Sequence, residues 1–232
     1  CIILELGDQL YRYDLGDNLP DNWSTDYYSP EYITPQYGRK NAIGAFLFYN
    51  DCRAAKQTLA QAIHNQTKKG NKYNLGTITN CEVTGEIRLL DLQTGLYHCS
   101  NIISLLLELD IDIISDRFYN YQSNQPYSVL ANAVSNLNSA NIITKLNAVK
   151  DINQFFYDCP PLLGQLLTDF GNGEPFKELL QSKGYEGYVF MEDFISDTFC
   201  LFNSNKITSP THKIISVESD RELQDLIKSI KK

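Results

Sequence analysis

Short apolar runs alternate with polar turns along the chain, and the clearest run lies near its start. Residues 42–49 (AIGAFLFY) are apolar without interruption, which is typical of a strand covered on both faces. Asp51 follows and can cap a helix, because a carboxylate accepts hydrogen bonds from the first backbone N–H groups of a helix. Apolar residues then recur at helical spacing, at Cys52, Ala55, Leu59, Ala62 and Ile63. The pattern therefore predicts a strand followed directly by a helix.

The rest of the pattern places strands toward both ends and helices in the middle. Between about residues 101 and 170, apolar residues recur at helical spacing. A last helix is predicted after residues 219–222 (SDRE), which have the sequence of a capping box. Because regular strand–helix alternation is missing, we expect an α+β fold with a mixed or antiparallel sheet. Further strands are predicted at 8–13, 75–78, 86–92, 188–191, 198–202 and 213–217.

The composition excludes several classes of protein. With 232 residues, 43% of them hydrophobic, the chain can bury the core of one domain. Its formal charge of -8 provides no positive field for a phosphate backbone, which argues against a nucleic-acid partner. No apolar run reaches the roughly 20 residues of a membrane-spanning helix, so no transmembrane segment is expected.

Several kinds of catalytic or metal site also find no support in the sequence. The six cysteines include no Cys-x-x-Cys pair, which argues against a zinc site and favours small buried side chains. His64, His98 and His212 lack ligand spacing and suggest neither a metal site nor a nucleophile relay. Glycine-rich nucleotide loops and Gly-x-Ser-x-Gly are missing, which excludes kinase, dehydrogenase and serine-hydrolase functions. The chain begins at Cys1 rather than Met, so we expect a processed or trimmed end.

Three groups of polar residues are candidates for chemistry. Arg12 lies in a predicted strand between two tyrosines and could bind phosphate or ribose, although an exposed strand arginine covering apolar surface is commoner. Tyr27 and Tyr28 offer flat rings suited to a planar ligand such as nicotinamide, or they pack on their own loop. Glu192 and Asp197 are either ordinary solvated carboxylates or groups that stabilise an oxocarbenium-like transition state.

Taken together, these segments resemble the ADP-ribosyltransferase superfamily, and within it the RES-domain group of NAD-consuming toxins. Residues 10–12 (LYR) are similar to the family's first strand with its arginine. Residues 37–49 (YGRKNAIGAFLFY) look like the RES segment in which Gly-Arg-x-Asn precedes a glycine and a strand ending in tyrosine. Residues 184–190 (GYEGYVF) and 199–203 (FCLFN) are similar to the paired strands before and after the catalytic acidic or serine position.

The resemblance covers about residues 9–64 and 173–208 and leaves the middle of the chain unmatched. It implies one ADP-ribosyltransferase-like domain over 1–232, with a split mixed or antiparallel sheet and a mostly helical insert at 99–172. It also implies NAD as co-substrate, without a metal ion. The catalytic residues implied are Arg12, Tyr28, Glu192 and Asp197. The NAD-binding residues implied are Arg12, Ser24, Tyr27, Tyr28, Arg39, Asn41, Tyr49 and Ser196.

The chain departs from the RES pattern at two positions. RES proteins usually place a glutamate in the helix after the tyrosine-ending strand, where this chain has Gln57 and Gln61. An amide cannot act as a carboxylate. The serine expected after Gly-Tyr-Glu-Gly is not at its usual place, with Glu192 near that position and Ser196 farther on. Glu192, Asp197 and Ser196 therefore compete for the acidic or polar catalytic role.

The resemblance leads to an expected activity and to two alternatives. The expected activity is cleavage of the nicotinamide–ribose bond of NAD and transfer of ADP-ribose to a macromolecule, with protein the favoured acceptor. Such a bacterial toxin or effector would be secreted or delivered into the cytoplasm of a target cell, or would act as a cytoplasmic toxin, and would have a cognate immunity or antitoxin protein. The alternatives are an NAD glycohydrolase or phosphorylase of RES type, and an inactive binding or immunity module that retains the NAD cleft.

Overall fold

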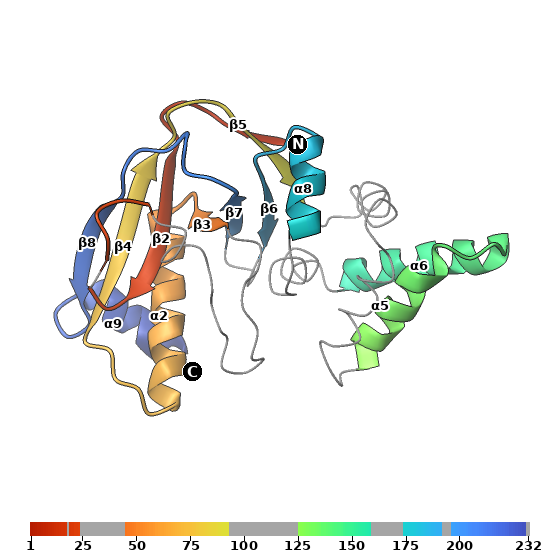
Figure 1. Ribbon diagram of the computed structural model, residues 1–232. Helices are drawn as coiled ribbons and strands as arrows, with labels where there is room; N and C mark the ends of the chain where they lie inside the picture. Colours follow the sequence, from red (N-terminus) through yellow and green to blue (C-terminus); the bar gives the residue numbers. More distant parts are fainter. Residues whose placement is uncertain (18, 24–44, 93–124, 159–173, 192–195, 231–232) are drawn as a thin grey trace.

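One eight-stranded sheet organises the part of the chain that the computed structural model describes, residues 1–17, 19–23, 45–92, 125–158, 174–191 and 196–230 (Figure 1). The strand order is β1-β5-β6-β7-β3-β2-β4-β8. The strands are β1 (Ile2–Leu4), β2 (Gln9–Leu15), β3 (Phe46–Tyr49), β4 (Leu75–Glu82), β5 (Ile87–Asp91), β6 (Gly187–Met191), β7 (Asp197–Leu201) and β8 (Thr211–Ser216). The described helices are α2 (Cys52–Lys68), α5 (Gln125–Asn136), α6 (Ile142–Asp158), α8 (Glu174–Ser182) and α9 (Arg221–Ile230).

The sheet is mixed but mostly antiparallel. Only β5 and β6 run parallel, and the other neighbouring strands are antiparallel. The predicted α+β class with a mixed sheet is therefore confirmed. It follows from the order of the elements, since antiparallel neighbours need no helical crossover between them.

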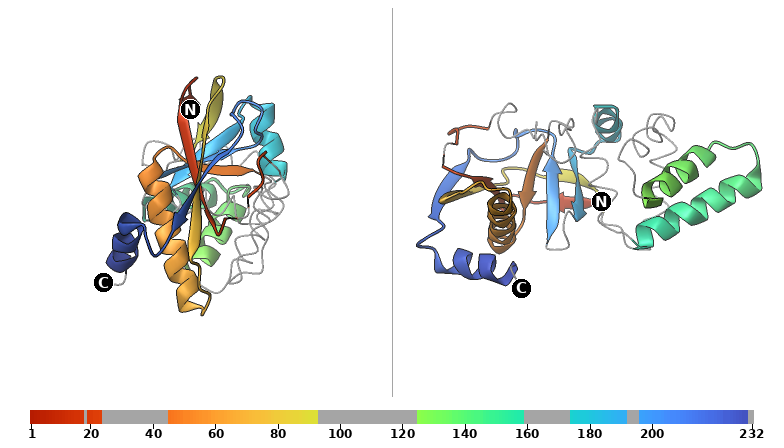
Figure 2. Two further views of the ribbon diagram at one scale, coloured as in Figure 1. Left: turned by 90° about the vertical axis from the view of Figure 1, so that its left-hand side faces the viewer. Right: turned by 90° about the horizontal axis from the view of Figure 1, so that it is seen from below.

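The backbone pairing between β2 and β3 is limited to a single residue pair. All 7 residues of β2 pair with β4, and all 4 residues of β3 pair with β7. β2 and β3 share only the pair Tyr11–Tyr49. In the left view of Figure 2, β2 (red) stands nearly upright while β3 (orange) runs nearly across it. The sheet therefore consists of two halves, β8-β4-β2 and β3-β7-β6-β5-β1, that diverge at this pair.

Side chains alternate along each strand, so the two faces of the sheet build separate cores. On one face, Tyr49 and Ile78 pack with α2, and Tyr188 packs with α5, α6 and α8. We call this the helix face. On the other face, Leu10 and Phe48 belong to a second core with β7, β6 and β5. We call this the Arg12 face, because Arg12 follows Leu10 by two residues on the same strand.

The predicted strand–helix pair is confirmed at β3 and α2. The Asp51 side chain caps α2, with its Oδ1 accepting a hydrogen bond from the backbone N–H of Arg53 at 2.8 Å. The helix lies close to β4 because Gly76 has no side chain, and a Cβ there would be 2.8 Å from the Leu59 methyl carbons. Complete burial of a leucine such as Leu59 contributes about 1.5–3 kcal/mol.

The chain ends differ in detail from the sequence-based expectation. The pattern does not predict β1, a strand of 3 residues that pairs with β5. The last helix is confirmed, but its cap is not Ser219. Asp220 Oδ1 accepts a hydrogen bond from the N–H of Leu223 at 2.8 Å. Glu222, the expected capping partner, instead forms an ion pair with Lys56 of α2 at 2.6 Å, so the capping-box prediction is wrong.

The described part of the chain middle is helical, as expected. α5 and α6 form an antiparallel pair that projects from one end of the molecule, on the side away from β8 (Figure 2, right). They reach the sheet through a core shared with α8, which includes Leu130, Ile152 and Leu180. None of the described helices has the length and apolar character needed to cross a membrane.

Candidate functional site

A polar cluster on the Arg12 face lies where β2, β4 and β8 run side by side. Arg12 and Asp14 are two residues apart on β2, so both side chains leave the same face. The register pairs Arg12 with Thr79 and Asp14 with Thr77 on β4. His212 of β8 pairs with Thr79 in turn. Three strands therefore bring these five polar side chains to one patch.

Arg12 and Asp14 form a two-pronged ion pair. The Arg12 Nε donates to Asp14 Oδ2 and Nη2 donates to Oδ1, each at 3.2 Å. Each side chain is only 15% exposed. Burial raises the pKa of Asp14 above its usual value, even though the charges of Arg12 and His212 and the hydrogen bonds from Arg12 act to lower that pKa. The carboxylate has thus lost more hydration than Arg12 replaces.

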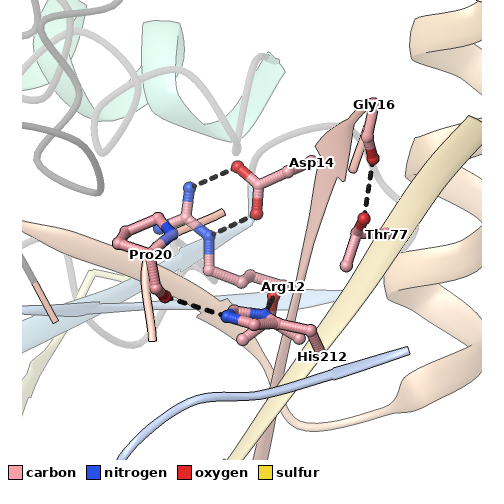
Figure 3. Close-up of polar contacts among 7 residues, drawn as sticks. Arg12, Asp14, Gly16, Pro20, Thr77 and His212 are labelled. Carbon is pink, nitrogen blue, oxygen red and sulfur yellow. Dashed lines mark hydrogen bonds and ion pairs between the residues drawn. The ribbon is translucent and has the colours of Figure 1, made fainter. Parts of the chain in front are cut away.

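Short hydrogen bonds link the neighbours of this ion pair to one another (Figure 3). The Thr77 hydroxyl donates to the Gly16 carbonyl at 2.7 Å. His212 Nε2 lies 3.0 Å from the Pro20 carbonyl oxygen, and its Nδ1 lies 2.9 Å from Thr79 Oγ1. A carbonyl can only accept, so Nε2 carries the proton, and in the neutral ring Nδ1 accepts from Thr79.

Residues 19–23 run along the edge of the cluster and hold an aromatic ring beside it. The Trp23 ring meets Phe46 and Phe48 edge to face, with centroids 5.7 and 5.3 Å apart. Its Nε1 donates to the Thr208 carbonyl at 2.7 Å. Trp23 therefore contacts β3, while Pro20 of the same segment contacts β8. This segment spans the divergence between the two halves of the sheet.

Asp197 and Ser196 lie at the start of β7, in the other half of the sheet. Asp197 alternates with Phe199 and Leu201 of the second core, so it belongs to the Arg12 face. It is half-buried. β7 is separated from β2 by β3 alone. Ser196 Oγ donates to Asn50 Oδ1 at 3.4 Å, which ties the start of β7 to the end of β3.

The structure brings some of the predicted site residues together and separates another. Arg12 and Asp197 share a face, and Ser196 adjoins Asp197. Tyr49 lies on the helix face, 4% exposed in the core with α2, so the sheet itself stands between its ring and Arg12. Six predicted site residues lie outside the described residues and stay predictions: Ser24, Tyr27, Tyr28, Arg39, Asn41 and Glu192.

Sequence reasoning missed Asp14 and His212. The position of Asp14 beside Arg12 was predictable from the sequence, because a residue two positions from Arg12 in a strand must share its face. The position of His212 was not predictable, since its place beside Thr79 depends on the register of β4 against β8, and these strands are more than a hundred residues apart in sequence. In the structure both ring nitrogens of His212 are hydrogen-bonded, to Thr79 and to the Pro20 carbonyl.

The cluster is suited to bind a ligand through hydrogen bonds and through the Arg12–Asp14 ion pair, whose two charges cancel. Cys81 follows Thr79 on the same face, but burial raises the pKa of its thiol to about 12, so it is no nucleophile at neutral pH. Within the described ranges, no group of three His, Cys, Asp or Glu side chains could hold a metal ion. The cluster offers a carboxylate and a guanidinium side by side in a place with little water.

The chain was compared with protein-family models, with curated proteins and with solved structures. None of the three comparisons found a match.

Proposed function

We propose that the protein is an NAD-dependent ADP-ribosyltransferase that transfers ADP-ribose to a macromolecular acceptor, with protein the favoured class. One observation carries the proposal. The segments that resemble this superfamily come from both ends of the chain, yet they form the adjacent strands β6-β7-β3-β2, with α2 directly after β3. Arg12 and Asp197 lie on one face across the divergence of the two half-sheets, which is where the proposed NAD site lies.

In the proposed reaction the bond between C1′ of the ribose and the nicotinamide nitrogen breaks. Its electron pair leaves with nicotinamide, which becomes neutral, and the ribose gains oxocarbenium character. A nucleophilic atom of the acceptor then bonds to C1′ and gives up its proton to water. A fixed group aimed at developing charge, such as an oxyanion-hole donor, is worth about 10²–10³ in rate, and a fixed carboxylate would act in the same way on the positive charge of the ribose. Asp197 or Glu192 would supply that carboxylate at the start of β7 or just before it.

The remaining predicted residues have roles in binding under this proposal. Arg12 would hold a ribose or a phosphate, and Arg39 would bind phosphate. Tyr27 or Tyr28 would stack on the nicotinamide ring, since tyrosine combines a flat apolar body with a polar tip. As a toxin or effector, the protein would be secreted or delivered into a target cell, or would act in the cytoplasm, with a cognate immunity protein as partner.

The test is an assay of nicotinamide release from NAD, run with and without cell lysate and with labelled NAD to follow transfer. Arg12→Lys keeps the positive charge but loses the planar fork, so we expect kcat/KM to fall about 100-fold. Arg53→Lys is the matched control, because Arg53 is exposed on α2, and it should leave the rate unchanged. Asp197→Asn, with the exposed Asp225→Asn as its control, tests the carboxylate.

Each outcome selects among the three activities. Nicotinamide release without transfer of label to any lysate component would replace the transferase with the glycohydrolase or phosphorylase. Equal activity of Arg12→Lys and wild type would contradict the site. Absence of turnover, together with an unchanged melting temperature on addition of NAD, would favour the inactive binding or immunity module.

A further inference from the structure

We propose that Arg12 and Asp14 together bind the vicinal hydroxyl groups of a ribose, and not a phosphate. The proposal assigns Asp14 a role in ligand binding and makes the ion pair, rather than the guanidinium alone, the recognition element. This proposal rests on the proposed function in one respect only, which is the identity of the substrate that carries the ribose.

The geometry of the ion pair makes phosphate a poor ligand. A phosphate binds arginine best through two parallel hydrogen bonds to one edge of the guanidinium. The edge formed by Nε and Nη2 is already occupied by the two Asp14 oxygens, at 3.2 Å each. An incoming phosphate would be left with the other edge, formed by Nη1 and the second N–H of Nη2, where it would lie beside the Asp14 carboxylate.

The charge of the cluster favours an uncharged ligand as well. The charges of Arg12 and Asp14 cancel, and in the described part of the chain the charged or titratable side chains that act on Asp14 are Arg12 and His212. β4 contributes the hydroxyls of Thr77 and Thr79 to this face, and the adjoining Asp17 is exposed. A phosphate would bring negative charge next to the Asp14 carboxylate in a place with little water, where like charges repel strongly.

A sugar diol matches the unused capacity of the carboxylate. Each Asp14 oxygen accepts one hydrogen bond from Arg12, whereas a carboxylate oxygen has room for two. Because burial raises the pKa of Asp14, a further hydrogen-bond donor to its ionised form would be stabilising. A hydroxyl group both donates and accepts, so two neighbouring hydroxyls can donate to Asp14 and accept from the guanidinium beside it. No net charge is buried in this arrangement.

The surrounding hydrogen bonds hold the pair in place. Thr77 and His212 are bonded to the backbone carbonyls of Gly16 and Pro20, which fixes the ends of the loop that follows β2. Figure 3 shows the Arg12–Asp14 pair between these two anchors. The pair is therefore organised before any ligand arrives, which lowers the ordering cost of binding.

The test measures binding of three small probes with different chemistry. Adenosine carries a ribose diol and no charge, 2′,3′-dideoxyadenosine lacks the diol, and inorganic pyrophosphate has charge without a diol. Trp23 is the only tryptophan of the chain and packs on Phe46 and Phe48 near the cluster, so its fluorescence reports binding, with calorimetry as a second measure. We expect adenosine to bind at least 10-fold more tightly than either other probe.

A matched pair of variants tests Asp14 directly. Asp14→Asn keeps the shape but removes the anionic acceptor, and we expect it to weaken adenosine binding about 10-fold without improving that of pyrophosphate. Asp17→Asn removes the same charge from an exposed residue three positions away and should change neither. The comparison of adenosine with the dideoxy analogue uses the wild-type protein, so it stands whether or not a variant folds.

Three results would overturn the proposal: tighter pyrophosphate binding in Asp14→Asn than in wild type, equal binding of adenosine and its dideoxy analogue, or no adenosine binding. These outcomes are separate from failure of the proposed function. Diol-dependent binding without NAD turnover would retain the ribose site and reject the transferase. NAD turnover with a lower KM in Asp14→Asn would retain the enzyme and reject the ribose site.

Discussion

At the scale of single residues, the ionisation of Asp14 is the most informative property of the cluster. A paired carboxylate usually has a lowered pKa, because its partner favours the charged form. Burial reverses this at Asp14, where the pKa is raised although Arg12 contacts both oxygens. The ionised side chain therefore does not stabilise the fold relative to its neutral form. A residue retained at such a cost is a candidate for function.

This property predicts how stability changes with pH. A carboxyl whose pKa is higher in the folded state binds its proton more tightly when folded, so its ionisation lowers the free energy of unfolding as pH rises through and above the unfolded pKa of about 3.9. As the pH falls from 7 to 4, wild type should gain stability relative to Asp14→Asn. Urea unfolding of both proteins across this range measures the difference.

His212 is present in both proteins, so its contribution largely cancels in that comparison. Repeating the measurement in a His212→Gln background removes it altogether. A constant difference between wild type and Asp14→Asn at all pH values would contradict the raised pKa of Asp14.

At the scale of elements, the pairing of β6 with β7 depends on a glycine. A Cβ at Gly187 would lie 2.0 Å from the carbonyl oxygen of Cys200 and 2.9 Å from a methyl carbon of Leu89. Real Cβ atoms do not approach backbone so closely, and neither strand can move without disturbing the two cores that contain Tyr188 on one face and Phe199 on the other. The glycine in Gly-Tyr-Glu-Gly therefore has a packing role that the family resemblance does not address.

Gly187→Ala should destabilise the protein by more than about 2 kcal/mol, since the clash involves backbone and cannot be relieved by a side-chain rotation. Gly85→Ala is the control, because the nearest atom to its Cβ would be 4.0 Å away, on the flexible Lys206 side chain. Chemical denaturation of both variants measures the difference. Similar stability of the two variants would show that β6 and β7 can separate at Gly187.

Local elements were predictable from the sequence, and contacts between distant ones were not. The Asp51-capped helix and the preceding strand follow from neighbouring residues, and so does the shared face of Arg12 and Asp14. The face occupied by Tyr49 depends on which side of the sheet α2 covers, and the strand alone does not encode that choice. The partner of His212 depends on strand register, and β1 is too short to give a periodic pattern.

At the scale of the whole molecule, the two half-sheets pack against different helices on the helix face. The half β8-β4-β2 has its core with α2 and α9, whereas β6 and β7 share theirs with α5, α6 and α8 on the same face. Between the halves lie the pair Tyr11–Tyr49, the start of α2, the contacts of Trp23 and, on the Arg12 face, the second core, in which Leu10 of β2 packs with residues of β3 and β7. Backbone hydrogen bonds thus contribute little to the connection.

This arrangement predicts two groups of amide protons in native-state hydrogen exchange. Amides that pair β2 with β4 should open together under mild denaturant, and amides that pair β3 with β7 should form a second group with a different opening free energy. Exchange followed by mass spectrometry of peptide fragments distinguishes the groups. A single opening free energy for all four strands would mean that side-chain packing couples the halves completely.

The single Tyr11–Tyr49 pair also affects the order in which the chain can fold during synthesis. β2 finds its partner β4 soon after both are made, but β3 pairs fully only with β7, about 150 residues later. Until Leu201 leaves the ribosome, the edge of the apolar segment Phe46–Tyr49 that will pair with β7 has unpaired backbone N–H and C=O groups, which can pair with another chain. A nascent chain halted before β7 should therefore aggregate or recruit chaperones, and release of the full chain should end that state.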